Sequence, residues 1–199
     1  MEVIVKSAWL INSKLITNFN ASTGELQAQI LFWIFAAGKT ASSAEILVQR
    51  LCPDKNTNPF DQQWRFYTKS NLIDLLKENR CGCYNTKGTA IYELMNKVNY
   101  EAFDLKECTL DQLLEIKGIG LKTAKAFIVH TRRDAEHAII DTHILKYLHL
   151  HGVKDVPKST PTSKKEYARL EKEFLELCKE SGKSVAEFDL EIWNSYANA

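Results

Sequence analysis

The sequence predicts an all-α fold, because helix-capping patterns and helical spacing of apolar residues recur along most of the chain. Ser22 with Glu25, and Ser42 with Glu45, each place a hydroxyl and a carboxylate at the capping-box spacing beside an apolar run. Turn-forming residues separate the runs, as in residues 52–61. Only residues 1–6 alternate like a strand, and we expect them to form a short extended arm.

Taken in order, the pattern predicts helices at residues 25–37, 45–51, 61–79, 88–98, 109–116 and 121–130, another after Asp141, and two more at 164–181 and 184–197. Residues 79–85 break the pattern. Residues 156–163 are rich in Pro, Ser and Thr and form a linker. In the helix at 164–181, Tyr167, Leu170, Phe174 and Leu177 share one face, which predicts that this face is buried.

The composition suits one compact unit or two small lobes, with 199 residues of which 45% are hydrophobic. Because 26 Lys and Arg balance 25 Asp and Glu to a net charge of +1, an anionic partner must be met by a local site. Five cysteines without a leader-like segment predict a reduced, intracellular protein that is not secreted, and the two thiols at residues 81–83 favour a turn over a metal site. The longest apolar run, residues 30–37, is too short to span a bilayer, so we expect no membrane contact.

The segment Lys117-Gly118-Ile119-Gly120 predicts a tight hairpin between two helices. It would place free backbone N–H groups and the positive end of the helix dipole at the start of the second helix, which favours a phosphate. An ordinary helix–helix turn, with the glycines serving only as caps and packing residues, explains the same pattern.

Lys122 follows the hairpin in the first turn of the second helix, where the helix dipole disfavours a positive charge and makes a neutral amine easier to obtain. Lys125, one turn further along, adds charge of the same sign. Asp141 stands directly before the helix that begins with Thr142, and is therefore an N-cap candidate. An isolated aspartate there would be a structural cap. An amine that attacks a sugar carbon must be deprotonated.

The hairpin with Lys122, and "IIDTHI" with Asp141, resemble the helix-hairpin-helix DNA glycosylase superfamily, which includes endonuclease III and the 8-oxoguanine glycosylases. Residues 81–98, "CGCYNTKGTAIYELMNKV", are similar to the superfamily's "GLYNSKA..I" segment. The run "ELQAQILFWIFAAGKTAS" is similar to its early core helix and following loop, and "FDLEIW" at residues 188–193 resembles the terminal "LDLxIW" of the archaeal-type second class of 8-oxoguanine glycosylases. Together these segments cover most of residues 21–193.

The resemblance implies a two-lobed fold of the HhH-GPD type with the active-site cleft between lobes, one lobe at about 41–145 and the other from about 1–40 plus 146–199, with the helix-hairpin-helix at about 109–131. It implies a monomeric DNA repair enzyme of the cytoplasm or nucleoid, or of a nucleus, that acts on double-stranded DNA with a damaged base. Lys122 would attack the sugar and Asp141 would assist, giving glycosylase and AP lyase activity. No cofactor is implied, apart from a monovalent cation held by carbonyls of residues 116–119.

The same resemblance assigns further residues to the site. It gives DNA-backbone contacts to Lys117, Gly118, Gly120, Thr123 and His143, base recognition to Gln27, Gln29, Gly38, Ala126, Asp189 and Trp193, and a place at the gap left by the extruded base to Tyr84, Asn85 and Lys87. Each of three residues also has a structural alternative. Trp193 could be a core residue of the last helix, His143 could make a structural hydrogen bond, and Tyr84 could pack at a plain helix start.

Three departures from the superfamily's pattern keep the substrate open. Only Cys178 lies beyond Asp141, so a four-cysteine iron–sulfur cluster is not expected. The chain ends "NSYANA", where the second class carries a lysine that holds the base, and residues 130–138 contain neither Gly nor Pro. An oxidised purine, foremost 8-oxoguanine, is the leading target. An oxidised pyrimidine or another modified base is an alternative, and a non-enzymatic DNA-binding hairpin module is an alternative of another class.

Overall fold

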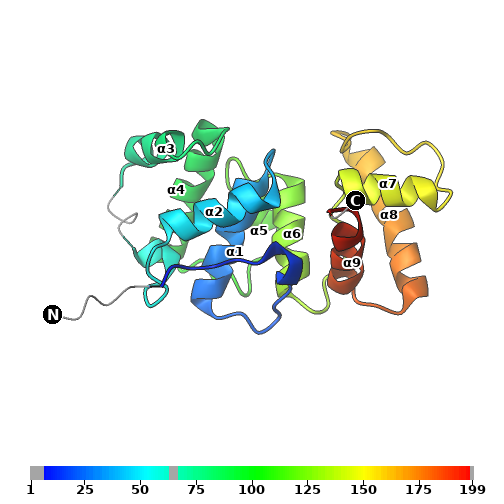
Figure 1. The fold of residues 1–199 in the computed structure, drawn as a ribbon, viewed down its shortest axis with the longest axis horizontal. Helices are drawn as coiled ribbons and strands as arrows, with labels where there is room; N and C mark the ends of the chain where they lie inside the picture. The colour runs from blue at the N-terminus through cyan, green and yellow to red at the C-terminus, as the bar shows by residue number, and fades with distance from the viewer. Residues whose placement is uncertain (1–6, 63–66, 198–199) are drawn as a thin grey trace. The chain divides into compact units, whose positions relative to one another are not determined.

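The structure is a computed structural model that describes residues 7–62 and 67–197, and every regular element in these ranges is helical (Figure 1). The elements are η1 (Ser13–Leu15), α1 (Thr23–Ala36), α2 (Ala41–Leu51), η2 (Pro59–Asp61), α3 (Lys69–Glu78), α4 (Tyr84–Tyr100), α5 (Leu110–Leu114), α6 (Leu121–Thr131), α7 (Thr142–Leu150), α8 (Lys164–Ser181) and α9 (Val185–Ala197). The all-α prediction is thus confirmed for the described residues. The arm expected at residues 1–6 lies outside them. None of the helices described is both long and apolar enough to cross a membrane.

The chain divides into two compact units. Unit 1 contains the described residues up to Ile16 and those within Asn20–Phe127, and unit 2 contains Thr17–Phe19 and the described residues from Ile128 onward. This division differs from the two lobes expected from the sequence. Residues 20–40 belong with the central segment because α1 packs against α2 and α4, and the boundary falls within α6.

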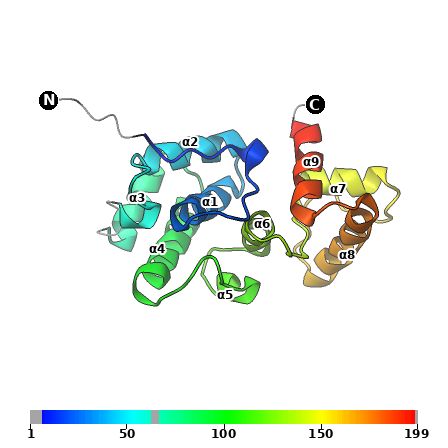
Figure 2. The same ribbon diagram turned by 90° about the horizontal axis from the view of Figure 1, so that it is seen from below.

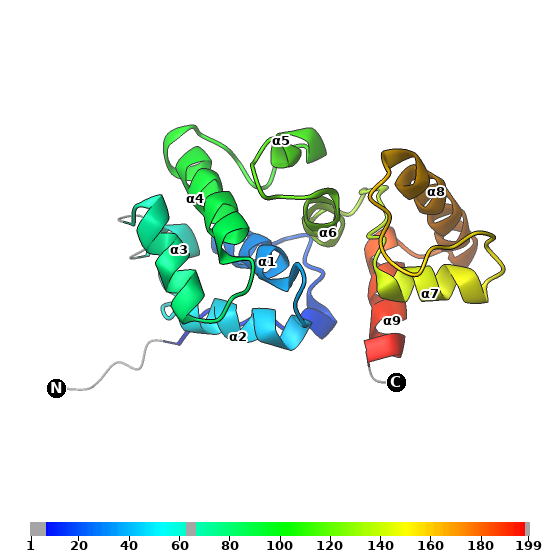
Figure 3. The ribbon, with the colours of Figure 1, turned by 90° about the horizontal axis from the view of Figure 1, so that it is seen from above.

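The core of unit 1 is built around α1, which is apolar on nearly all sides and therefore buried. Ile30, Leu31, Phe32 and Phe35 are almost completely inaccessible to solvent. Helix α3 packs along α4, and the two lie side by side in the view from below and in the opposite view from above (Figures 2 and 3). Unit 1 thereby forms a helical support for the hairpin that joins α5 to α6.

Unit 2 is a cluster of α7, α8 and α9, in which α9 packs against both other helices. The predicted apolar face of α8 is buried through Tyr167, Leu170 and Phe174. Phe174 meets Phe188 of α9 with ring centroids 5.3 Å apart. Helix α7 begins at Thr142, directly after Asp141.

The helix boundaries follow local capping signals, with three corrections to the boundaries predicted from the sequence. The capping box of Ser22 and Glu25 at α1 is confirmed. The box predicted from Ser42 and Glu45 is wrong: Thr40 caps α2 by accepting the Ser43 N–H, and Glu45 instead accepts the Ser13 N–H at 2.7 Å.

The helix predicted at 61–79 is also shorter than expected where it is described. Thr68 caps α3, and the helix begins at Lys69, so Tyr67 lies outside it. Part of the predicted span, residues 63–66, lies outside the described residues. In the other direction, α4 starts at Tyr84, earlier than the predicted residue 88, because Cys83 reverses the chain with a positive φ of 48°.

Candidate active site

The predicted helix-hairpin-helix is present in unit 1, where residues 115–120 join α5 to α6. Ile116 and Ile119 point into the core, and the Ile119 N–H donates to the Ile116 carbonyl at 3.0 Å. Lys117, Gly118 and Gly120 are exposed. The apolar residues thus anchor the hairpin, and its polar and glycine residues form the surface that a ligand can reach.

Gly118 and Gly120 differ in whether the surrounding structure leaves room for a side chain. Gly118 has φ +99°, and a Cβ there would lie 2.6 Å from the Thr86 carbonyl oxygen of α4. A Cβ on Gly120 would have no atom within 4 Å. Packing therefore requires glycine at 118, whereas at 120 the absence of a side chain leaves open space in front of the first turn of α6, as close approach of a DNA backbone would need.

Helix α6 carries three of the predicted site residues in its first two turns. Lys122 is exposed, whereas Thr123 and Ala126 are buried. Lys125, expected to add positive charge near Lys122, is only 4% exposed. Of the two α6 lysines, Lys122 is therefore the one whose amine a substrate can reach.

The segment assigned to the duplex gap forms the first turn of α4, not a loop before it. Tyr84 is half-buried and Asn85 is exposed, and the Thr86 carbonyl lies against the hairpin at Gly118. The structure therefore brings the first turn of α4, at Thr86, and the hairpin together on unit 1, although they are distant in sequence.

Lys87 occupies a different environment from its neighbours. Its side chain is 3% exposed, and its Nζ donates to the Phe35 carbonyl at 2.9 Å. Burial lowers the pKa of the Lys87 amine, the Cys81 and Cys83 thiols oppose that change, and Lys39 adds to it. The carbonyl belongs to the last turn of α1, where helix geometry provides no partner, so Lys87 completes a helix end inside unit 1.

Asp141 is the N-cap of α7, as predicted. Its Oδ1 accepts the backbone N–H groups of His143 at 2.9 Å and Ile144 at 3.0 Å. Both hydrogen bonds fix the orientation of the Asp141 carboxylate at the start of α7. The side chain is half-buried, so unit 2 presents an oriented carboxylate at the start of a helix.

Three rings gather near the start of α7 and the end of α9. The His143 ring lies edge-to-face with the Trp193 ring, with centroids 6.3 Å apart, and nearly parallel to the Tyr196 ring, with centroids 6.2 Å apart. Lys146 places its Nζ 4.7 Å from the centre of the Tyr196 ring. All three rings are only half-buried. His143 and Trp193 were predicted from the sequence, whereas Tyr196 was not, although its place three residues after Trp193 puts both on one helix face.

Asp189, paired with Trp193 in the sequence analysis, has its carboxylate turned to another partner. Its Oδ2 lies 3.4 Å from His130 Nε2, and His130 Nδ1 lies 2.9 Å from the Thr17 hydroxyl. Asp189 and His130 are both buried. Within unit 2 this arrangement ties α9 to the last turn of α6.

The candidates for base recognition in unit 1 differ in whether their polar atoms already have hydrogen-bond partners in the fold. Gln27 Oε1 accepts the Phe60 N–H at 2.8 Å, and Gln29 Nε2 donates to the Ile16 carbonyl at 3.1 Å. Gln29 Oε1 is buried and has no hydrogen-bond partner in the described part of the chain. Gly38 has φ +69°, and an added Cβ would meet nothing within 4 Å. Gln27 thus serves the fold, and Gln29 retains an unused acceptor.

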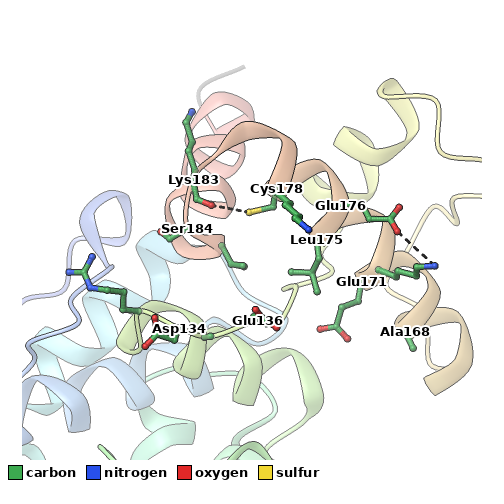
Figure 4. Close-up of a pocket in the computed structure, with 14 residues that line it drawn as sticks. Asp134, Glu136, Ala168, Glu171, Leu175, Glu176, Cys178, Lys183 and Ser184 are labelled. Carbon is green, nitrogen blue, oxygen red and sulfur yellow. Dashed lines mark hydrogen bonds and ion pairs between the residues drawn. The ribbon is translucent and has the colours of Figure 1, made fainter.

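Unit 2 also contains a hollow of about 830 Å³ between α8, residues 133–136 and residues 183–185 (Figure 4). Most of its lining side chains are charged, with both signs interspersed, including Asp134, Glu171, Lys172 and Lys179. None of the residues assigned to the site from the sequence lines it. In the two described stretches, no three His, Cys, Asp or Glu side chains are grouped as a metal site would require.

Most of the chain is similar to a known protein family. The family model Ogg-HhH, described as 8-oxoguanine DNA glycosylase, matches residues 16–183. An 8-oxoguanine DNA glycosylase/AP lyase of Thermotoga sp. (strain RQ2) is 33% identical over 102 residues, which are 51% of this chain and 46% of that protein. The matched stretch thus spans about half of this curated relative.

Two crystal structures have the same fold as this chain. The 8-oxoguanine glycosylase/lyase of Methanocaldococcus jannaschii, in complex with 15mer DNA containing 8-oxoguanine, has a TM-score of 0.66 at 24% identity and covers 94% of this chain and 88% of its own. Tm1821, the 8-oxoguanine DNA glycosylase of Thermotoga maritima, has a TM-score of 0.66 at 23% identity, with 92% and 86% coverage.

Proposed function

We propose that this chain, which belongs to the Ogg-HhH family of 8-oxoguanine DNA glycosylases, is itself a DNA glycosylase and AP lyase that excises 8-oxoguanine. The observation that carries the proposal is that the family match, over residues 16–183, includes an exposed lysine directly after an open glycine hairpin and a carboxylate oriented by a helix start. We assign Lys122 as the nucleophile and Asp141 as the group that assists it.

The hairpin would bind the DNA backbone without a basic surface. The N–H groups at the start of α6 and the space in front of Gly120 suit one phosphate, and Lys117 and Thr123 lie beside it in sequence. Such a local contact agrees with a net charge of only +1. His143, in the first turn of α7, is the corresponding candidate in unit 2 through its half-buried side chain, because its backbone N–H already donates to Asp141.

The chemistry then needs the target nucleotide outside the stack, because its sugar carbon is inaccessible within a duplex. Neutral Lys122 would attack C1′, the bond from C1′ to the base would break, and the base would leave after gaining a proton. Opening of the sugar gives a Schiff base between Lys122 and C1′. Loss of a proton from C2′ then expels the 3′ phosphate and nicks the strand. Asp141 would stabilise positive charge on the sugar and accept a proton from the amine.

For the extruded base, we propose the aromatic face of His143 and Trp193 as a stacking surface, with Tyr196 beside it. Gln29 is the best-placed polar candidate in unit 1, because its Oε1 acceptor has no partner among the described residues. Asn85 and Tyr84 are the candidates for the duplex gap, because they belong to the first turn of α4, whose Thr86 carbonyl faces the hairpin at Gly118.

We also propose a monovalent cation at the hairpin carbonyls of residues 116–119. The Ile116 carbonyl accepts the Ile119 N–H, and a carbonyl oxygen has a second lone pair that a cation can use. Exchanging potassium for a bulky organic cation at constant ionic strength should weaken DNA binding. Unchanged affinity would remove the cation from the proposal.

The reaction and its substrate are tested together with end-labelled duplexes. One carries 8-oxoguanine opposite cytosine, and the others are undamaged, carry an oxidised pyrimidine, or contain an abasic site. We expect strand cleavage on the 8-oxoguanine and abasic duplexes and none on the undamaged one. Cleavage of the oxidised-pyrimidine duplex in preference to the 8-oxoguanine duplex would show that the substrate is an oxidised pyrimidine instead. Binding without cleavage of any duplex would leave only a DNA-binding module.

A further inference from the structure

Three buried residues, Ala138, Ile139 and Ile140, lead directly into Asp141 and belong to no helix or strand. Buried backbone polar groups must nevertheless find hydrogen-bond partners. A sheet would supply them from a neighbouring strand. Here, side chains from α8 and from the linker before it take that role.

Tyr167 supplies two of these hydrogen bonds with one oxygen. Its hydroxyl donates to the Ala138 carbonyl at 2.8 Å and accepts the Ile140 N–H at 3.1 Å. The ring is 3% exposed, and burial raises the pKa of the hydroxyl, so the group remains a neutral donor and acceptor. One side chain thus bridges two residues of the segment as a paired strand would.

Two further side chains hold the same segment at its ends. Glu171, one turn after Tyr167 on α8, accepts the Ala138 N–H with Oε1 at 2.8 Å. Thr160, in the linker before α8, donates its hydroxyl to the Ile140 carbonyl at 3.0 Å. Figure 4 shows Glu171 reaching from α8 toward the chain that carries Glu136. The backbone N–H and carbonyl groups of both Ala138 and Ile140 are therefore satisfied by side chains.

We infer that Tyr167, supported by Thr160 and Glu171, is a positioning residue for Asp141. The inference rests on the proposed function, in which Asp141 assists the reaction. On its C-terminal side, Asp141 is held by its own bonds to His143 and Ile144, and on its N-terminal side by the bonds that Tyr167 and Thr160 make to Ile140. Rotation of residues 138–140 would move the Asp141 carboxylate, and the Tyr167 hydroxyl opposes that rotation.

Tyr167→Phe tests this inference most cleanly, because it removes one oxygen and two hydrogen bonds and keeps the buried ring. Glu171 is a poorer choice, since its Oε1 also lies 3.8 Å from His137 Nδ1 and a substitution would disturb both contacts. Thr160→Val provides an independent second variant, because it keeps the shape and removes only the bond to Ile140. Tyr147→Phe is the matched control: it removes a hydroxyl from the same unit, on a ring that packs against His151 and Phe188.

Single-turnover excision of 8-oxoguanine should be measured at saturating enzyme, together with Kd for a duplex containing a stable abasic-site analogue. The temperature should lie well below every variant's melting point, so that each is fully folded. We expect Tyr167→Phe to excise roughly tenfold to a hundredfold more slowly, as a small misplacement of a catalytic group does, with Kd changed less than twofold. Thr160→Val should slow excision in the same direction, and Tyr147→Phe should match the wild type.

The outcomes separate this inference from the proposed function. If the wild type does not excise 8-oxoguanine, the proposed function fails first. If the wild type is active and Asp141→Asn is slow, but folded Tyr167→Phe and Thr160→Val excise at the wild-type rate, the positioning role is overturned. Equal losses of rate and affinity would also overturn it, because they indicate a general structural effect.

Discussion

At the scale of single residues, burial separates the side chains that a substrate can reach from those that complete the fold. Lys122 and Asn85 are exposed, whereas Lys87 is buried and bonded to the end of α1. The sequence alone predicted that all three would face DNA. It could not tell them apart, because the Phe35 carbonyl that receives Lys87 lies far away in the chain and only the fold brings it near.

Lys87→Met tests this separation. The variant keeps most of the side-chain volume but leaves the buried Phe35 carbonyl without its donor, so we expect a loss of about 1–3 kcal/mol in the free energy of unfolding. DNA affinity should stay within twofold of the wild type, as measured by fluorescence anisotropy. Asn85→Ala is the exposed counterpart on the same helix turn and should weaken binding without loss of stability. The reverse result, weaker binding by a fully stable Lys87→Met, would place the amine at the DNA.

Cys52 provides a test of burial through pH. Its side chain is fully buried, and burial raises the pKa of the thiol from 9.0 to about 12. Between these pH values the thiol loses its proton in the unfolded chain but keeps it in the folded protein. The contribution of Cys52 to the free energy of unfolding is therefore fully present below pH 9 and is lost as the pH rises toward 12. Near pH 11 the loss amounts to about 2–3 kcal/mol.

Cys52→Ala should remove that alkaline loss. Urea denaturation of both proteins from pH 7 to 11 should give parallel stability curves below pH 8, and above pH 9 the wild type should fall more steeply. Equal slopes above pH 9 would show that the Cys52 thiol ionises as readily in the folded protein as in the unfolded chain.

At the scale of elements, local signals predicted more than long-range ones. The helix at 164–181 has the predicted bounds, and the caps at Ser22 and Asp141 are as expected, because such hydrogen bonds join residues within one turn. The cap of α2 was misassigned, since Thr40 and Ser42 are both suitable residues and the choice depended on a contact between Glu45 and Ser13. The hydrogen bonds of the Tyr167 hydroxyl to Ala138 and Ile140 could not be predicted, because the sequence shows only that Tyr167 lies on an apolar helix face.

The hairpin glycines give a paired prediction at this scale. Gly118→Ala places a Cβ 2.6 Å from the Thr86 carbonyl at a φ of +99°, so we expect destabilisation of at least about 1–3 kcal/mol. Gly120→Ala meets no atom within 4 Å and should leave stability within about 0.5 kcal/mol of the wild type. It should nevertheless weaken DNA binding, because the methyl group enters the space proposed for a phosphate. Thermal melts and a binding titration of both variants decide this. Unchanged DNA affinity in Gly120→Ala would argue against a phosphate at this position.

At the scale of the whole molecule, the family and the all-α architecture followed from motifs that are each short and local. The division into units did not, because it depends on α1 packing against α2 and α4 and not on the order of the segments. The candidate site was predictable at Asp141 as far as its capping position, because helix capping restricts the residue type, while the catalytic roles of Lys122 and Asp141 stay predictions. It was less predictable for base recognition, where Gln27 and Asp189 turned out to have partners within the fold.

Lys122 is the residue that we propose forms the covalent intermediate, and locating that bond tests the proposal most directly. The wild type, Lys122→Gln and Lys125→Gln should each be incubated with the 8-oxoguanine duplex and sodium borohydride, and the trapped peptide identified by mass spectrometry. A Schiff base at Lys122 predicts an adduct on that residue, none in Lys122→Gln, and trapping retained by Lys125→Gln if that variant folds. An adduct on another lysine of the wild type, or undiminished trapping by Lys122→Gln, would contradict it.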